Sequence, residues 1–391
     1  MSAQELSPIN PSNRNALIDI LRGWALFIVV LMNILPFYWH NKPENFNISE
    51  FSTTWWMVRI QFELFSTKGW TLLGVLFGYG FAQLLYSTEA KGINSYRYFL
   101  WRMLLLFIIG LINSAFYGGD ILLDYAVVGA LLLFFFKLKT KYLWAISIIL
   151  LLCVPFLDPY FSQHKWNVEW LTALQEKYTK AGELGAKFLL NYIERLQTMI
   201  FALNYSVTVH LVQLACFLLG ILAFRFEFFN TLSTVFKPLL KRVFWISGSL
   251  FIVVLTIDSL VRYVFENEAV FKVVSLRYVK AIPGMLLFAS GFCLLYIRWP
   301  ELRLLQALKV VGRMTLTNYL VQNIITFILF IQFKIDMEIY GYTLLALMIF
   351  VGQAFFSKWW LSQFNYGPVE WIWRCASYRK KFPLRKENLL V

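Results

Sequence analysis

Runs of apolar residues, each about as long as a bilayer is thick, constrain this chain more than any other feature. A spanning α-helix needs about 20 predominantly apolar residues. Ten runs reach or approach that length, and they cover residues 16–38, 55–86, 98–117, 120–136, 142–157, 200–224, 243–265, 277–297, 311–333 and 342–363. The sequence therefore predicts an all-α fold, a polytopic membrane helix bundle with about ten transmembrane helices.

Two of these runs are irregular. The run 55–86 is too long for one straight crossing, so it either tilts or begins with an interfacial turn at Trp55 and Trp56. The run 142–157 is short, and its helix is expected to end at Pro155, because proline interrupts helical hydrogen bonding.

The composition also indicates a membrane protein. Hydrophobic residues make up 59% of the chain and charged residues only 15%, whereas a soluble domain carries about 25% charged residues. The net charge of +14 comes from short basic clusters between the apolar runs, which fits the positive-inside rule. We therefore expect a lipid bilayer, and no nucleic acid, as the partner of these basic residues.

The basic clusters predict the topology as well. Ten crossings with both the N and C termini cytoplasmic place these clusters on one side, and residues 364–391 then form a basic cytoplasmic tail. On the opposite side, residues 158–197 have helical periodicity and are expected to form an extracytoplasmic amphipathic segment. No internal repeat or soluble-domain boundary is visible, so residues 1–391 are interpreted as a single integral-membrane domain.

No metal site or disulfide framework is predicted. The four cysteines all fall within or beside apolar runs, and no two of them have metal-ligand spacing: Cys153, Cys216, Cys293 and Cys375. The sequence also contains no nucleotide-phosphate motif.

Ionisable residues inside the apolar runs are candidates for function, because each costs about 2.5–3.5 kcal/mol at the centre of a spanning helix. Asp19 and Arg22 are three residues apart, so they share a helical face and either pair at the cytoplasmic end or belong to a site. Lys68 has no acid on its own helical face other than Glu63, and it precedes a glycine-rich stretch that predicts close packing. Further pairs have the i,i+4 spacing of helical ion pairs: Arg59–Glu63, Asp258–Arg262 and Glu370–Arg374.

Polar residues also gather at the starts of two other runs. Asp120 is expected to cap the helix that it precedes, whereas Asp124 lies one turn deeper and is not explained as a cap. The segment 312–323, "GRMTLTNYLVQN", includes Arg313, Asn318 and Gln322. These side chains either join neighbouring helices or line a cavity.

Of the three histidines, His40 is the one with access to both water and the bundle, since it follows the first run at the outer boundary. A histidine there has a pKa suited to a general base. His164 lies in the long outer segment and His210 inside a run, where a lone histidine more often satisfies a hydrogen bond than catalyses.

Several motifs resemble those of the YeiB-like (DUF418) family of bacterial inner-membrane proteins. They are "LIDILRGWALFIVVLMNI" (17–34), "KGWTLLGVLFGYGF" (68–81), "GGDILLDYAVVG" (118–129), "GRMTLTNYLVQNII" (312–325) and "GPVEWIWR" (367–374). The resemblance runs from about residue 14 to residue 378 and implies the bacterial cytoplasmic (inner) membrane. Many members have a histidine where this chain has Asn113.

The first motif is also similar to transmembrane acyltransferases, which open with an Asp–x–x–Arg–Gly stretch. In those enzymes a histidine follows the Asp by fourteen residues, and Asn33 stands at that position here. A related group of lysosomal acetyltransferases has Asn there too, with its histidine in the following loop. His40, seven residues past Asn33, is the nearest counterpart in this chain.

The resemblance implies acyl transfer across the membrane, from cytoplasmic acyl-CoA (acetyl-CoA) to an extracytoplasmic glycan or small molecule. In this interpretation His40 takes the acceptor proton, and Asn33 orients it or donates to the developing oxyanion. The implied catalytic set also includes Asn113 and Asp120. The side chains implied in binding acyl-CoA are Asp19, Arg22, Lys68, Arg313, Asn318 and Gln322.

Two other functions fit the same residues. Buried Lys68, Asp124 and Arg313 would line a substrate or proton path in a transporter or channel without covalent chemistry. In a scaffold or assembly factor, the charges would only pair helices. The enzymatic interpretation requires the polar side chains to converge on one hydrated cavity that opens to both sides. Exposed aromatic and glycine faces additionally make a homodimer plausible.

Overall fold

The computed structural model describes residues 14–40, 42, 47–92, 94–163, 188–189, 192–193, 207–232, 236–263, 265 and 268–386. Its main helices are α1 (Ala16–Ile34), α2 (Pro36–His40), α3 (Thr53–Phe65), α4 (Lys68–Glu89), α5 (Ser95–Ser114), α6 (Leu122–Phe135), α7 (Thr140–Gln163) and α10 (Val207–Arg225). They continue with α11 (Lys237–Tyr263), α12 (Glu268–Phe271), α13 (Leu276–Arg298), α14 (Arg303–Arg313), α15 (Thr315–Thr326), the π-helical η3 (Phe327–Gln332), α16 (Ile339–Gln363) and α17 (Pro368–Tyr378). The described chain contains no β-strand.

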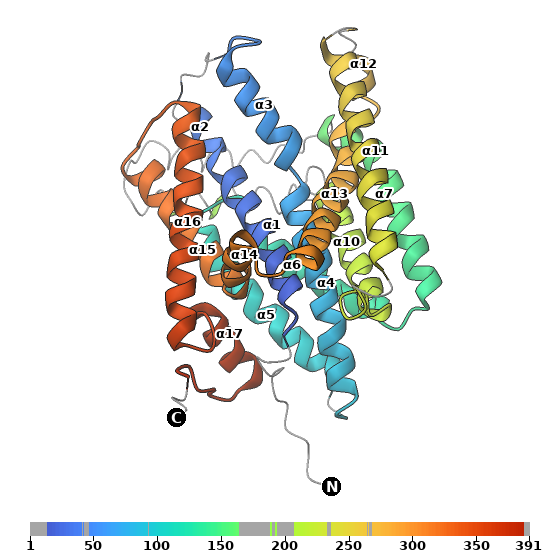
Figure 1. Cartoon of the computed structure of the whole chain (residues 1–391), viewed down its shortest axis with the longest axis vertical. Helices are drawn as coiled ribbons and strands as arrows, with labels where there is room; N and C mark the ends of the chain where they lie inside the picture. Colours follow the sequence, from blue (N-terminus) through green and yellow to red (C-terminus); the bar gives the residue numbers. More distant parts are fainter. Residues whose placement is uncertain are drawn as a thin grey trace.

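The structure confirms the predicted fold class, an all-α membrane helix bundle. Eight spans in the described chain are long and apolar enough to cross a bilayer: α1 with α2, α5, α7, α10, α11, α13, α15 with η3, and α16. The α6 helix is apolar but has only 14 residues. The start of α1 and the α17 helix both lie in the lower half of Figure 1, and the assignment of that side to the cytoplasm stays a prediction.

Local sequence signals explain where several helices begin. The Asn15 side chain caps α1 by accepting a hydrogen bond from the Leu17 N–H at 3.0 Å. Ser52 caps α3 and Asn94 caps α5 in the same way. Short oxygen-bearing side chains are favoured at these positions because they satisfy N–H groups that have no partner inside the helix.

The α1 helix lies inside the bundle, and its apolar window is 67% buried, compared with 22% for α7 and 28% for α11 and α16. It packs against α4, α13, α14, α15 and α16. The outer helices expose large apolar side chains such as Trp245 and Phe355. Exposed apolar faces of this kind suit lipid contact, so the chain is an integral membrane protein. The homodimer stays a prediction.

The long run 55–86 forms two helices. The sequence predicts instead one helix, either tilted or beginning with an interfacial turn. The helix breaks between Phe65 and Lys68, and Thr67 adopts a left-handed backbone conformation with φ of 72°. Figure 1 shows α3 in the upper part of the molecule and α4 below it. Branched residues rarely adopt this conformation, so surrounding contacts must hold Thr67 in place.

Two further boundaries differ from the predictions. The α7 helix does not end at Pro155 but continues through Pro155 and Pro159 to Gln163. The first residues of the predicted outer segment 158–197 therefore belong to α7, and most of the rest of that segment lies outside the described residues. The run 311–333 is broken at Met314, which separates α14 from α15.

The α14 helix crosses α1 with almost no space between the two backbones. A Cβ atom on Gly23 would lie 2.0 Å from the Leu308 carbonyl oxygen, and one on Gly312 would lie 1.8 Å from the Asp19 carbonyl oxygen. Only glycine allows so close an approach. This crossing holds the end of α14, with Arg313, beside the first turn of α1.

Replacing Gly23 with alanine is therefore expected to destabilise the bundle by about 3 kcal/mol, because the backbones of α1 and α14 must move apart. SDS-induced unfolding of the purified protein measures this difference. Gly352→Ala in α16 is the matched control, since no described atom would lie within 4 Å of the new methyl group. Equal stability of the two variants would contradict the close crossing.

Candidate functional site

Two arginine side chains bind the buried carboxylate of Asp19 at the start of α1, and a third lies within electrostatic reach of it. Arg14 binds both carboxylate oxygens, with Nε and Nη2 each 2.7 Å from one of them. The predicted pair with Arg22 is present at 3.4 Å between Nη1 and Oδ1, but Arg14 is the closer partner. Arg313 interacts electrostatically with both Arg14 and Asp19. We call Arg14, Arg22 and Arg313 the arginine cluster.

The arginine cluster has more positive than negative charge. Burial lowers the pKa of Arg313, and the charge of Arg14 lowers it further, against the opposing effect of Asp19. Arg374 of α17 is also within electrostatic reach of Arg14. The side chains of Arg14 and Arg22 are 32% and 29% exposed, so an anion can reach them. Guanidinium groups bind phosphate in a bidentate manner, which makes this cluster a candidate phosphate site.

A second group of polar side chains joins α5, the segment before α6, and α15. The Asp120 carboxylate accepts hydrogen bonds from Asn113 Nδ2 at 2.6 Å, Tyr319 OH at 3.0 Å and the Leu123 N–H at 3.2 Å. Asn323 Nδ2 donates to Asn113 Oδ1 at 3.3 Å. All four polar side chains are buried. We call Asn113, Asp120, Tyr319 and Asn323 the polar seam; its contact with the Leu123 N–H agrees with the predicted capping role of Asp120.

Two buried glutamines lie next to polar contacts of the α6 region. Gln322 follows Tyr319 by three residues, and Gln213 follows His210 by three, where His210 Nε2 lies 3.0 Å from Asp124 Oδ1. Neither glutamine amide has a hydrogen-bond partner within the described part of the chain. Buried amides without partners are unfavourable by about 2–7 kcal/mol, so a polar molecule that reached them would gain hydrogen bonds.

The start of α15 is held by Glu370 of α17. The Glu370 carboxylate accepts hydrogen bonds from the Leu316 and Thr317 N–H groups, at 2.7 and 3.0 Å, and from the Thr317 hydroxyl at 2.5 Å. Burial raises the pKa of Glu370, although these hydrogen bonds favour its ionised form. The i,i+4 spacing suggested a pair with Arg374, but the Arg374 guanidinium lies 4.4 Å from the centroid of the Tyr366 ring instead.

Glu370→Ala is expected to lower the free energy of unfolding by about 1–2 kcal/mol, because it removes the cap of α15. Glu370→Gln keeps an acceptor oxygen, so it should lower the free energy of unfolding by less. The matched control is Glu301→Ala, which removes an exposed carboxylate. The midpoints of thermal unfolding should decrease in the order control, Gln, Ala, and a Glu370→Ala midpoint equal to that of the control would rule out the capping role.

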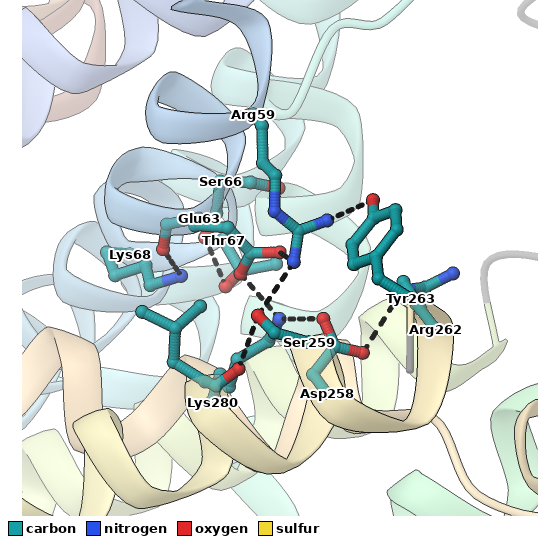
Figure 2. A network of polar contacts seen from close by, with 11 residues as sticks. Arg59, Glu63, Ser66, Thr67, Lys68, Asp258, Ser259, Arg262, Tyr263 and Lys280 are labelled. Atoms are coloured by element: carbon teal, nitrogen blue, oxygen red, sulfur yellow. Dashed lines mark hydrogen bonds and ion pairs between the residues drawn. The ribbon is translucent and has the colours of Figure 1, made fainter. Parts of the chain in front are cut away.

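A third group of charged side chains joins α3, α11 and α13, as Figure 2 shows. Lys280 Nζ lies between two carboxylates, 2.5 Å from Glu63 Oε2 and 2.9 Å from Asp258 Oδ2. The predicted pairs within helices are present but longer: Arg59–Glu63 at 4.0 Å and Arg262–Asp258 at 3.2 Å. We call these five residues and Lys68 the ion-pair cluster. Its closest ion pairs join different helices, and the i,i+4 spacing did not indicate them.

The structure distributes the predicted site residues over separate groups. Asp19, Arg22 and Arg313 belong to the arginine cluster, Asn113 and Asp120 to the polar seam with Gln322 next to it, and Lys68 to the ion-pair cluster. Asn318 joins α15 to α16 through a 3.0 Å hydrogen bond from its Nδ2 to Ser357 Oγ. Asn33 lies partly buried in the last turn of α1. His40 ends α2, and its side chain lies outside the described residues.

The described side chains therefore do not gather at one centre, and the hydrated cavity that opens to both sides stays a prediction. A cavity of about 320 Å³ is lined by Tyr86, Phe224, Arg225, Glu227 and Asn230, none of them a predicted site residue. The physical reason is local compensation: a charge in lipid is stabilised by the nearest partner. The sequence does not indicate the partners of Tyr319 and Asn323, because those partners, Asp120 and Asn113, are distant in the chain.

Comparisons with known proteins agree with this architecture. Residues 223–380 match the family described as "Protein of unknown function (DUF418)". The chain is 28% identical to "Uncharacterized protein YxaH" of Bacillus subtilis, with 98% of this chain and 99% of that protein aligned. It is 26% identical to "Uncharacterized protein YeiB" of Escherichia coli, over 95% of this chain and 98% of that protein. No solved structure matches the chain.

The similarity to these relatives extends over nearly the whole chain, and the family match includes the segments that form α13, α14, α15, α16 and α17. It therefore covers the helices that carry Arg313, the α15 part of the polar seam and Glu370. The chain is thus an integral membrane protein whose residues 223–380 match the DUF418 family and whose whole length is similar to YxaH and YeiB.

Proposed function

We propose that this protein transfers an acyl group from cytoplasmic acyl-CoA to an acceptor on the other side of a bacterial cytoplasmic membrane. The observation that carries the proposal is the arginine cluster, in which Arg14 and Arg22 bind the single carboxylate of Asp19 and Arg313 lies within electrostatic reach of it. Coenzyme A carries several phosphate charges at one end, and a partly exposed surplus of guanidinium groups is the chemistry that binds them.

The polar seam is the second part of the proposed mechanism. Acyl transfer requires groups that hold the acceptor and the developing oxyanion in a place from which bulk water is excluded. Asp120, fixed by Asn113, Tyr319 and the Leu123 N–H, provides a rigid hydrogen-bonded centre. Gln322, about one helical turn after Tyr319, provides a buried amide with unused hydrogen-bonding capacity. In this proposal His40 takes the acceptor proton as the acceptor bonds to the thioester carbon. The carbon–sulfur bond then breaks, and the coenzyme A thiolate takes up that proton and leaves as the thiol.

The direct test uses purified protein in nanodiscs with acetyl-CoA labelled in the acetyl group. Release of the coenzyme A thiol together with acetylation of an acceptor present in a membrane extract is the expected result. Acyl transfer would be ruled out if heat-denatured protein released as much thiol as the native protein and no labelled product formed.

Arg22→Ala is expected to weaken acetyl-CoA binding about 10- to 100-fold, because hydrogen bonds to charged groups contribute about 1.5–3 kcal/mol. Folding should survive, since Arg14 still binds both oxygens of Asp19. Arg97→Ala is the matched control, as it removes an exposed arginine from the start of α5. Equal affinities of the two variants in a calorimetric titration would remove Arg22 from the donor site.

The ion-pair cluster favours a second candidate, transport without covalent chemistry. Charges held between α3, α11 and α13 are typical of substrate or ion pathways in membranes. A transporter would move an acidic or basic solute into proteoliposomes and release no thiol from acetyl-CoA. The two assays together decide between the candidates.

A further inference from the structure

Each of the two carboxylates of the ion-pair cluster already interacts with two cations. Each Glu63 oxygen faces a different base, Arg59 at 4.0 Å and Lys280 at 2.5 Å. The same holds for Asp258, whose oxygens face Arg262 at 3.2 Å and Lys280 at 2.9 Å. Figure 2 shows both carboxylates directed toward the space between α3, α11 and α13. They have little capacity left to neutralise another cation.

Lys68 is that further cation. Lys68 is only 3% exposed, and its Nζ donates a hydrogen bond to the backbone carbonyl of Glu63 at 2.7 Å. The ammonium group also lies 5.2 Å from the centroid of the Phe251 ring. Gly284 leaves room for the side chain, because a Cβ there would lie 2.7 Å from Lys68 Cε. No carboxylate of the described residues forms an ion pair with Lys68.

The charges of the cluster therefore do not balance within the part of the chain that the structure describes. Four bases, Arg59, Lys68, Arg262 and Lys280, face two acids, Glu63 and Asp258, which leaves two positive charges. The charges of Lys280 and of the exposed Arg277 repel that of Lys68. A buried cation with surplus neighbours of the same sign is unfavourable unless an anion accompanies it.

The break between α3 and α4 adds to the positive potential at the same place. The α4 helix begins at Lys68, inside the bundle, and its first N–H groups receive no side-chain cap. The N-terminal end of a helix carries a partial positive charge that favours anions. Interrupted helices with this arrangement hold anionic groups in membrane transporters. The left-handed Thr67 is the residue that turns the chain into this position.

We propose that a small anion, a carboxylate or a phosphate group, binds between Lys68, Lys280 and Arg277 at the start of α4. The ammonium protons of Lys68 that do not bind the Glu63 carbonyl hydrogen-bond to this anion, and Arg277 attracts it from the exposed side of α13. The group belongs either to a soluble anion or to the head group of an anionic lipid. The site is separate from the arginine cluster and does not require acyl transfer.

The test measures thermal unfolding of the full chain by tryptophan fluorescence, in nanodiscs of phosphatidylcholine, with inorganic phosphate or acetate added at constant ionic strength. The parent protein should be stabilised in a saturable manner. Lys68→Met should abolish the response, and Lys358→Met, which removes an exposed lysine of α16, should leave it unchanged. Arg277→Gln should raise the half-saturating concentration by about threefold to tenfold, equivalent to about 0.7–1.4 kcal/mol.

Nanodiscs of phosphatidylglycerol distinguish the two sources. If a lipid head group occupies the site, the parent is stabilised in these discs, Lys68→Met is not, and phosphate adds nothing. The proposal is overturned if neither anion nor lipid stabilises the parent, or if Lys68→Met responds as the parent does. If Lys68→Met does not fold, Arg277→Gln tests the proposal in its place. A half-saturating anion concentration equal to that of the parent then overturns the proposal. Acetyl-CoA is absent throughout, so these results are independent of acyl transfer.

Discussion

Asp120→Ala is expected to lower the free energy of unfolding by about 3–5 kcal/mol, because three buried donors lose their acceptor at once. These donors are Asn113 Nδ2, the Tyr319 hydroxyl and the Leu123 N–H, which belong to α5, α15 and α6. The loss should loosen the contact between these helices. Under the proposed function, the variant should also lose acyl transfer, since the centre of the polar seam disappears.

SDS-induced unfolding of the purified variants measures the stability change. Asp336→Ala is the matched control, because Asp336 is a 43% exposed aspartate whose partner, Lys42, lies in a loop. Exposed ion pairs contribute about 1 kcal/mol or less. Tyr319→Phe removes a single hydroxyl from the seam and should fall between the two alanine variants. Similar stabilities for Asp120→Ala and Asp336→Ala would show that the seam does not hold the bundle together.

His40→Ala is expected to reduce the rate of acyl transfer by about 100-fold or more, the usual contribution of a general base. The expectation depends on the proposed function and on the position of His40 at the end of α2, directly after the most buried span. Stability should be unchanged. The measurement is the initial rate of coenzyme A release at saturating acetyl-CoA in nanodiscs.

His164→Ala is the matched control, since it removes a histidine from the predicted outer segment. His40→Gln separates proton transfer from hydrogen bonding, because glutamine can donate and accept hydrogen bonds but cannot take the proton at neutral pH. A His40→Ala rate equal to that of the parent would eliminate His40 as the base and leave the donor site at Arg22 unaffected.

Three contacts between residues near in sequence were predictable, although the closer partner of Asp19, Arg14, was not. Asp19 with Arg22 and Asp258 with Arg262 pair as their spacing indicates, and Asp120 caps the start of α6. The partners of Lys280 and Glu370 could not be predicted from the sequence, because Glu63 lies 217 residues from Lys280 and Thr317 lies 53 residues from Glu370. One-dimensional spacing contains no information about contacts between helices.

The sequence alone determined that this protein is a helical membrane bundle, because each apolar run must satisfy its backbone hydrogen bonds internally in lipid. It also indicated, as candidate functional residues, most of the polar side chains that cluster in the structure. Only the tertiary structure decided that these side chains divide among an arginine cluster, a polar seam and an ion-pair cluster. Helix breaks at Thr67 and Met314 and the glycine contact of α1 with α14 bring distant partners together, and each buried charge is stabilised by the partner that packing places nearest.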